Sequence, residues 1–160
     1  MRILNAAILA TATLFAASTA FAADPAEVNR AFFTAYSKKP GAKSAGNGLQ
    51  YRVLASGKGA KPTRSDCVTV NYKGTFVDGR VFDQSQPGQP ISFPVMGVIT
   101  GWTQALQMMH VGDKWELAIP SHLAYGEGGT PDGTIPPNTP LVFEVELLKT
   151  APSQMGRCPR

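Results

Sequence analysis

Histidine and cysteine are scarce in this sequence, which has two of each among its 160 residues. Neither His110 nor His122 has a Cys, His or carboxylate at the spacing of zinc ligands, so we expect no metal site. Ser85 and Ser121 lack the Gly-x-Ser-x-Gly context of a nucleophile elbow. The glycine-rich stretch 126–129 is not followed by Lys-Ser or Lys-Thr, as a phosphate-binding loop would be. Hydrolase and nucleotide-binding functions are therefore not supported, and no cofactor is expected.

The sequence also lacks an apolar run of the ~20 residues that a transmembrane helix needs. Residues 3–17 are apolar, but they follow Arg2 and precede Ala20-Phe21-Ala22, which fits the small-x-small pattern of signal-peptide cleavage. We therefore predict a secretory signal peptide at residues 1–22 and export to the periplasm of a Gram-negative bacterium, with the cell surface or secretion left open. An uncleaved N-terminal anchor is the alternative, and no membrane insertion is expected after cleavage.

The 15 Lys and Arg residues only slightly outnumber the 11 Asp and Glu residues. The formal net charge of +4 comes from scattered Lys and Arg residues, so nucleic-acid binding is not indicated. Cys67 and Cys158 form an even count, which favours a disulfide in an exported protein. Such a bridge would close a loop of about 90 residues and would stabilise the fold. Two free thiols are the alternative.

A short helix is predicted just after the cleavage site. Asp24 suits the N-cap and Pro25 suits the first helical position. The apolar residues that can share one face are Val28, Phe32, Ala35 and Tyr36. This helix docks on the domain, serves as an interaction arm, or is a frayed lead-in. Residues 40–48 contain three Gly and one Pro and look like a linker, so 23–48 is assigned as a short N-terminal helix and linker.

Strand patterns dominate the rest of the chain. Alternating or β-rich segments lie at 49–54, 67–72, 76–77, 81–82, 91–93, 114–119 and 141–148. Asp78-Gly79 is a hairpin turn signal, and the polar residues 84–90 interrupt a strand. One short helix is predicted at 101–109, with Gly112 beyond its end. We therefore expect an α+β domain at 49–150, in which four to six antiparallel strands wrap around one short central helix, followed by a tail at 151–160.

Aromatic and branched apolar residues accumulate at strand ends and in loops. Each of them alone suits a core, and Trp102 in particular could simply fill it. The loop residue Tyr125, the run 135–137 and the pair Phe82-Asp83 are harder to explain by packing. Apolar pockets with a few placed polar groups are the usual form of a small-ligand or peptide site. The apolar candidates are Tyr72, Phe82, Phe93, Val98, Ile99, Trp102, Tyr125, Ile135 and Phe143.

Short motifs follow one another in a specific order: Val70-Asn71-Tyr72-Lys73-Gly74, Asp78-Gly79 with Phe82-Asp83, Val98-Ile99 with Gly101-Trp102, Met109 with Val111-Gly112, Ala124-Tyr125-Gly126, Ile135-Pro136-Pro137 and 141–147. In this order and spacing they resemble the FKBP-type peptidyl-prolyl cis–trans isomerases. The match runs from about Leu49 to Lys149. Segments 49–54 and 101–106 look most like the secreted bacterial branch that includes the macrophage infectivity potentiator proteins.

The resemblance implies a half-barrel of antiparallel sheet around the central helix, with a proline pocket between them. Trp102 would form the floor, the Ile99 N–H and the Tyr125 hydroxyl would hold the peptide, and Asp83 would accept a hydrogen bond from Tyr72. The residues with an implied catalytic role are Tyr72, Phe82, Asp83, Trp102 and Tyr125. Those with an implied role in substrate binding are Phe93, Val98, Ile99, Ile135 and Phe143.

The implied partners are proline-containing polypeptides and macrolides such as rapamycin and FK506. Ile91 stands where eukaryotic members often have an aromatic residue, and Pro94 stiffens the approach to Ile99; both bear on macrolide affinity and sequence preference. Dimeric relatives carry a long helical arm, for which this chain has about a dozen residues, so a monomer is expected. The competing function is a non-catalytic binding module or chaperone that uses the same pocket.

Overall fold

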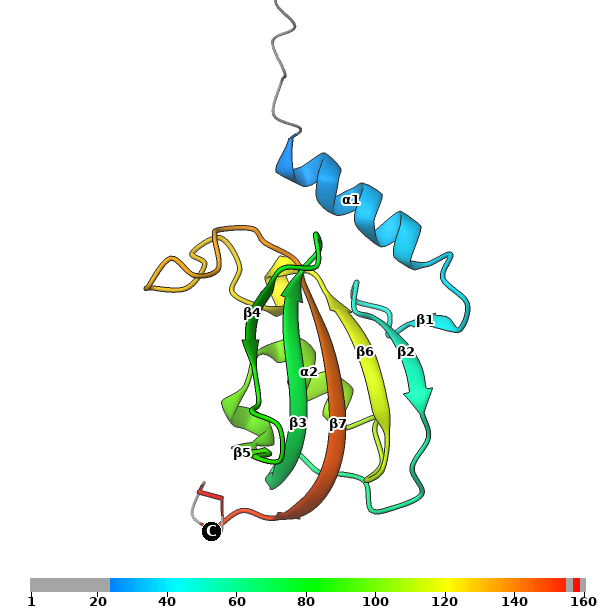
Figure 1. Cartoon of the computed structure of the whole chain (residues 1–160), viewed down its shortest axis with the longest axis vertical. Coiled ribbons are helices and arrows are strands. Elements are labelled where there is room, and N and C mark those ends of the chain that lie inside the picture. Colours follow the sequence, from blue (N-terminus) through cyan, green and yellow to red (C-terminus); the bar gives the residue numbers. More distant parts are fainter. Residues whose placement is uncertain (1–23, 155–156, 159–160) are drawn as a thin grey trace, which may run out of the picture.

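The computed structural model describes residues 24–154 and 157–158. The predicted signal peptide, residues 1–22, lies outside the described residues. The chain folds into one antiparallel sheet that curves against one short helix, which confirms the predicted α+β class (Figure 1). Among the described helices, none combines the length and the apolar character needed to cross a membrane.

The described residues form a sheet of seven strands in the order β1-β2-β6-β7-β3-β4, with β5 also paired to β3. β4 and β5 pair with opposite ends of β3, so residues 85–90 interrupt one edge of the sheet, as predicted. β3 and β7 lie side by side in the middle of the sheet (Figure 1). The strands are β1 Ala42–Ser44, β2 Gln50–Ala55, β3 Asp66–Phe76, β4 Val81–Gln84, β5 Ile91–Pro94, β6 Lys114–Ile119 and β7 Leu141–Pro152.

β1 lies in the segment that was predicted to be a linker. It pairs antiparallel with β2, from Ala42 opposite Arg52 to Ser44 opposite Gln50. Gly46 and Gly48 have φ values of 95° and 96°, a left-handed conformation that glycine adopts without steric cost. The glycines therefore form a tight hairpin between β1 and β2, and the prediction of four to six strands was too low.

Two α-helices and two 3₁₀ turns complete the described chain: α1 Pro25–Tyr36, η1 Val95–Gly97, α2 Thr100–Leu106 and η2 Ser121–Leu123. α2 ends before the predicted limit at Met109. Gln107 is its C-cap, and the chain then turns toward Gly112, whose N–H donates to the Leu147 carbonyl at 2.8 Å. This contact with β7 directs residues 107–112 away from the helix axis, although Met109 itself stays fully buried.

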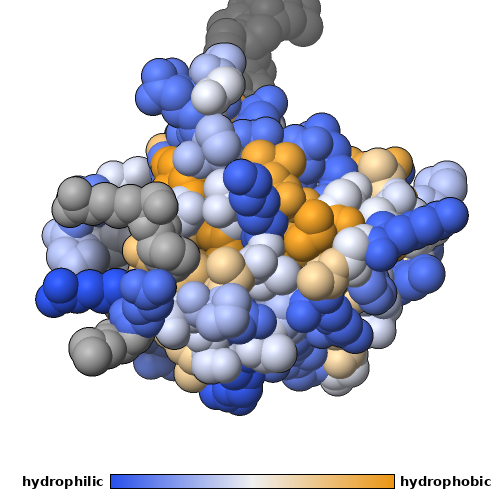
Figure 2. Space-filling model, turned by 90° about the horizontal axis from the view of Figure 1, so that it is seen from below, coloured by the Kyte–Doolittle hydropathy of each residue, from blue (hydrophilic) through white to orange (hydrophobic). Residues whose placement is uncertain are grey.

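The core lies between α2 and one face of the sheet. Along β3, Val68 and Val70 are fully buried, and the side chains between them point to the other face. On α2, Trp102, Ala105 and Leu106 are buried and belong to this core. On the end of the molecule seen in Figure 2, hydrophilic side chains form most of the surface and apolar ones gather in one region.

α1 docks on the domain through residues in both of its halves, Asn29 and Tyr36. Tyr36 is 1% exposed, and its hydroxyl donates to the Glu116 carbonyl of β6 at 3.2 Å. Asn29 donates to the Asn138 carbonyl at 3.0 Å. The docked face differs from the predicted one, because Val28 is 41% exposed and Ala35 is also exposed. Of the alternatives for this helix, the structure supports docking.

The C-terminal residues are fastened to the start of β3. Cys67 and Cys158 form a disulfide that spans 91 residues of sequence. β7 continues to Pro152 because its last residues pair with the beginning of β3, from Cys67 opposite Ala151 to Asp66 opposite Pro152. The predicted tail at 151–160 therefore begins as sheet.

We expect the double variant Cys67→Ser/Cys158→Ser to lose about 2–5 kcal/mol of unfolding free energy, because the bridge restricts a long loop in the unfolded chain. Urea denaturation of the oxidised protein and of the variant measures this difference. Dithiothreitol should destabilise the parent protein and leave the variant unchanged. Equal midpoints for oxidised parent and variant would contradict the stabilising role.

Candidate functional site

A cavity of about 430 Å³ lies between the start of α2 and the sheet, and we call it the Trp102 cavity. Its residues come from β3, β4, β5, β7, the start of α2 and the loop after η2. Asp83 is the single charged residue among them. The described residues that line it are Tyr72, Asp83, Phe93, Gly97, Val98, Ile99, Trp102, Tyr125 and Phe143.

Trp102 lies at the centre of the aromatic cluster. It is 4% exposed, and three aromatic rings meet it edge to face. Its ring centroid lies 5.5 Å from that of Tyr72, 6.1 Å from that of Phe93 and 5.3 Å from that of Phe143. Such edge-to-face pairs add specific attraction to apolar burial. Trp102 therefore both fills the core, as the simpler interpretation held, and lines the cavity.

The position of Trp102 depends on the residue before it. A Cβ atom at Gly101 would lie 2.6 Å from Cγ2 of Ile119 on β6, closer than Cβ atoms approach other atoms. Glycine therefore lets the first turn of α2 lie directly on the sheet. This contact fixes the position of the next residue, Trp102, whose indole lines the cavity.

Gly74 on β3 likewise leaves room for neighbouring side chains, here the rings of Phe82 and Phe143. A Cβ atom there would lie 2.7 Å from Cζ of Phe82 and 2.8 Å from Cε1 of Phe143. Those two rings meet edge to face, with centroids 5.5 Å apart. Phe82 thus supports Phe143 from behind and is not among the lining residues.

Ile135 is the other predicted residue that does not line the cavity. It is 3% exposed and packs in the core, and its N–H and carbonyl both bond to Thr130. The structure therefore places eight of the ten predicted residues around one cavity and two behind it.

Tyr72 and Asp83 form the polar pair of the cavity. The Tyr72 hydroxyl donates to Oδ2 of Asp83 at 2.6 Å, the hydrogen bond that was expected from the sequence. The pairing of β3 with β4 sets this geometry, since Gly74 lies opposite Asp83 and Tyr72 is two residues away on the same face. Burial, and then the hydrogen bond to Asp83, raise the pKa of Tyr72 well above its ordinary value of 10.0. The phenol therefore stays neutral and remains a donor.

Two further residues that line the cavity, Ile99 and Tyr125, carry hydrogen-bond donors. Tyr125 is 40% exposed, and its pKa is raised first by burial and then by the nearby Asp83 and Asp132 carboxylates. Ile99 is the N-cap of α2, and its carbonyl accepts the N–H groups of Trp102 and Thr103. Among the hydrogen bonds of the described residues, none uses the Ile99 N–H or the Tyr125 hydroxyl. Both donors are thus available to a bound group.

Gly97 is the lining residue that the sequence analysis missed. It belongs to η1, directly before Val98, and lines the cavity with backbone alone. A glycine gives no chemical signal of a site in a sequence, and only the spatial position of η1 reveals this one.

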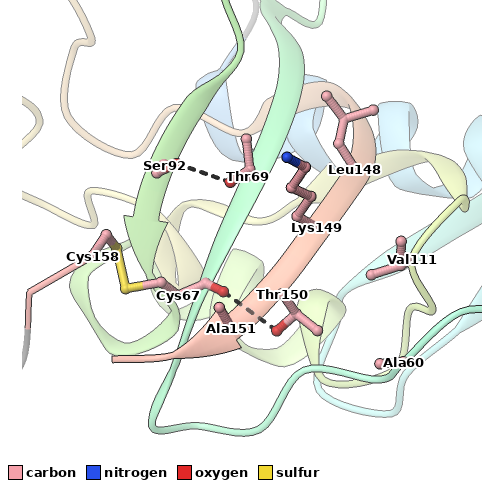
Figure 3. Close-up of a pocket in the computed structure, with 10 residues that line it drawn as sticks. All are labelled: Ala60, Cys67, Thr69, Ser92, Val111, Leu148, Lys149, Thr150, Ala151 and Cys158. Carbon is pink, nitrogen blue, oxygen red and sulfur yellow. Dashed lines mark hydrogen bonds between the residues drawn. A yellow bond between two sulfur atoms is a disulfide. The ribbon is translucent and has the colours of Figure 1, made fainter. Parts of the chain in front are cut away.

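A second cavity, of about 530 Å³, lies beside the disulfide on the other face of the sheet (Figure 3). There the Thr69 and Ser92 hydroxyls bond to each other at 2.9 Å, and the Thr150 hydroxyl donates to the Cys67 carbonyl. Lys149 is its single charged residue, and no aromatic side chain is among the described residues that line it. None of the predicted pocket residues is there, so the candidate site is the Trp102 cavity.

The Trp102 cavity has no Ser, Cys, Lys or His among its described lining residues. An apolar cavity with one carboxylate and a few hydrogen-bond donors is suited to hold an apolar group without covalent chemistry. The site therefore belongs to the class that binds a small apolar ligand or a peptide side chain.

The comparisons with known proteins identify the family. The model of the FKBP-type peptidyl-prolyl cis–trans isomerases matches residues 58–148. The chain is 52% identical over 124 residues to the peptidyl-prolyl cis–trans isomerase Mip of Coxiella burnetii and 56% identical over 113 residues to the FKBP-type 22 kDa isomerase of Escherichia coli. These matches cover 77% and 70% of this chain. The chain belongs to the FKBP-type peptidyl-prolyl cis–trans isomerase family, which confirms the resemblance noted in the sequence.

Solved structures agree with this assignment. FkpA of Escherichia coli superposes with a TM-score of 0.77 at 46% identity, over 83% of this chain and 62% of that chain. A peptidyl-prolyl cis–trans isomerase of Pseudomonas syringae superposes with a TM-score of 0.75 at 44% identity, over 79% of this chain and 93% of that chain. The chain spans about half the length of the curated relatives it matches, 54% for both Mip and the 22 kDa isomerase.

The raised pKa of Tyr72 predicts a loss of stability at alkaline pH. Its contribution is complete below the unfolded pKa of about 10 and is lost as the pH rises above that value, because only the unfolded chain ionises readily. We expect the melting temperature to fall less between about pH 9.5 and 11.5 in Tyr72→Phe than in the parent protein. Circular dichroism melts measure both slopes, and parallel slopes would contradict the assignment. Tyr51→Phe is the control.

Proposed function

We propose that this chain accelerates cis–trans rotation about X-Pro bonds of exported polypeptides. The observation that carries the proposal is the Trp102 cavity, an aromatic enclosure beside the hydrogen-bonded Tyr72–Asp83 pair. Membership of the family supports the same activity. The relatives are named peptidyl-prolyl cis–trans isomerases, and the proposal assigns that activity to this chain as well.

The reaction needs no nucleophile. Rotation about an X-Pro bond has a barrier of about 18–20 kcal/mol, because the twisted amide loses its resonance. The twisted amide has less charge separation than the planar one and therefore loses less on leaving water. An apolar cavity shaped to it lowers the barrier by binding the transition state more tightly than the ground state. In this chain, Trp102, Phe93 and Phe143 would exclude water from the proline ring.

The polar groups would fix the twisted bond in place. The free Ile99 N–H and the Tyr125 hydroxyl would donate to carbonyl oxygens of the peptide. The Asp83 carboxylate, which accepts from Tyr72 at 2.6 Å, would hold that ring as a wall and polarise the cavity. Phe82 and Ile135, from behind the lining, would keep Phe143 and the 124–140 loop in position.

Macrolide ligands, the oligomeric state and the location are further parts of the proposal. We propose that macrolides such as rapamycin compete for the Trp102 cavity, because their apolar rings suit an aromatic enclosure. We propose a monomer, since Tyr36 and Asn29 of α1 bond to the chain's own domain. We propose a periplasmic location, since residues 1–22 have the pattern of a signal peptide. A sedimentation mass of one chain is the expected check on the oligomeric state.

The test of the function is the isomerisation rate of a short X-Pro peptide, measured by NMR exchange with and without rapamycin. Acceleration that rapamycin abolishes is the expected result. Acceleration that rapamycin leaves unchanged would contradict the macrolide proposal alone. A folded protein that gives no acceleration would overturn the isomerase and leave the non-catalytic binding module.

Asp83→Leu should lower kcat/KM by about tenfold, equivalent to about 1.4 kcal/mol of transition-state stabilisation, because Tyr72 would lose the acceptor that holds its ring in place. The fold should lose less than about 1 kcal/mol, since Asp83 is exposed. Asp78→Asn is the matched control, because this carboxylate of the same hairpin bonds only to Arg80. Adding Tyr72→Phe to Asp83→Leu should cost little more if the two act as one unit. Unchanged activity of Asp83→Leu would contradict the role.

A further inference from the structure

One face of α1 is turned toward the domain. Among the residues of α1 whose burial is described, those that are not exposed are Asn29, Phe32, Phe33 and Tyr36. Their spacing of i, i+3, i+4 and i+7 places them on one side of an α-helix. Because a helix rises about 1.5 Å per residue, Asn29 and Tyr36 are about 10 Å apart along its axis. α1 therefore contacts the domain at two separate points.

The two contacts of α1 reach different parts of the domain. The Tyr36 hydroxyl donates to the Glu116 carbonyl of β6 at 3.2 Å, within the sheet. The Asn29 amide donates to the Asn138 carbonyl at 3.0 Å, within the 124–140 loop. In the part of the chain that the structure describes, this is the one hydrogen bond that joins α1 to the loop. Both lie at the end of the sheet where β6 ends and β7 begins, so α1 connects the loop to the sheet (Figure 1).

Asn138 has a backbone conformation on which its two hydrogen bonds depend. Its φ of 56° makes it the one non-glycine residue with a positive φ among the described residues. This left-handed conformation is uncommon for residues with a side chain, although asparagine adopts it more readily than most. The Asn138 N–H donates to the Gly126 carbonyl at 2.8 Å, while its carbonyl accepts from Asn29. The bond from α1 therefore helps to hold the conformation that presents the N–H to Gly126.

Gly126 connects this contact with the candidate site. It directly follows Tyr125, which lines the cavity and is 40% exposed. The Gly126 N–H donates to the Ser121 carbonyl at 2.8 Å, and the Gly126 carbonyl accepts from Asn138. The backbone just after Tyr125 is thus held from two sides. Since the Tyr125 hydroxyl has no partner among the described hydrogen bonds, the position of the ring depends on this backbone.

We propose that Asn29 is a positioning residue for the isomerisation, because it holds Tyr125 in place for the peptide. It acts through Asn138 and Gly126. The proposal rests on the proposed isomerase function, in which the Tyr125 hydroxyl donates to the substrate. α1 lies outside residues 58–148, the part matched by the family model, and the proposal makes it part of the working site.

The loss of the Asn29 bond has a specific kinetic consequence. Tyr125 would then have to be ordered each time a peptide binds, whether the X-Pro bond is planar or twisted. A cost that falls equally on the ground state and the transition state raises KM and leaves kcat unchanged. A bond that only stabilised the fold would change neither constant in the folded protein.

The experiment measures kcat and KM of the full-length chain by NMR exchange, over a series of concentrations of a short X-Pro peptide. Asn29→Ala should raise KM about two- to fivefold, the effect of one exposed hydrogen bond, with kcat unchanged. Asn29→Asp keeps the shape of the side chain but replaces the donor with an acceptor, so it should raise KM at least as much. Thr34→Ala is the matched control, because Thr34 is exposed on the same helix and its hydroxyl takes no part in the hydrogen bonds of the described residues.

Two further measurements separate positioning from general stabilisation. In a Tyr125→Phe background, Asn29→Ala should leave KM unchanged, because the hydroxyl through which it acts is gone. Hydrogen exchange of the Asn138 amide, which donates to Gly126, should become about two- to fivefold faster in Asn29→Ala. Thr34→Ala should leave that exchange unchanged. The exchange rate needs no activity, so it tests the contact between α1 and the loop by itself.

The outcomes separate the two proposals. The supporting result is a rise of KM in both Asn29 variants, absent from Thr34→Ala and from the Tyr125→Phe background, together with faster exchange. Unchanged exchange of the Asn138 amide would overturn the positioning role, and so would faster exchange with an unchanged KM. A rise of the same size in the Tyr125→Phe background would also overturn it, because the effect would not pass through Tyr125. No acceleration by the folded parent protein would overturn the isomerase and the role of Asn29 in it, while the exchange rate would still show whether α1 holds the loop.

Discussion

The close approach of α2 to the sheet is the contact on which the rest of the site depends. Gly101 lies so near Ile119 that a Cβ atom there would force either the Ile119 side chain or the helix to shift. This contact fixes the position of Trp102 relative to the sheet. The rings of Tyr72, Phe93 and Phe143 then meet the Trp102 ring edge to face. A helix of seven residues has little stability of its own, so its position is fixed by this packing. The functional cavity and the hydrophobic core are therefore parts of one structure.

The polar part of the site follows from the same arrangement. β4 pairs with β3 so that Asp83 meets the Tyr72 hydroxyl beside the aromatic wall. Burial keeps that hydroxyl protonated, so the cavity holds a neutral phenol bonded to a carboxylate. Such a pair polarises its surroundings without exchanging protons with a ligand. That property suits a reaction in which an amide is only rotated.

The sequence predicts some of these features much better than others. Alternation and the Asp78-Gly79 turn predict β3 to β4, β6 and β7, because side-chain period and turn chemistry are local properties. The pocket residues came instead from the order of family motifs. β1 was missed because glycines that look like a linker form a hairpin, and α2 ended early because Gly112 bonds to β7, far away in sequence. The position of Gly97 at the cavity depends on spatial neighbours, which no local pattern contains.

The topology of the sheet also bears on how this chain itself folds. β3 pairs with β7 over partners 65 to 86 residues apart, from Phe76 with Leu141 to Asp66 with Pro152. Without β7 the sheet would divide into β1-β2-β6 on one side and β3 with β4 and β5 on the other. Contacts so distant in sequence make folding slow, and the sheet cannot close before nearly the whole chain has been made. The two parts of the sheet therefore stay separate until β7 is available to join them.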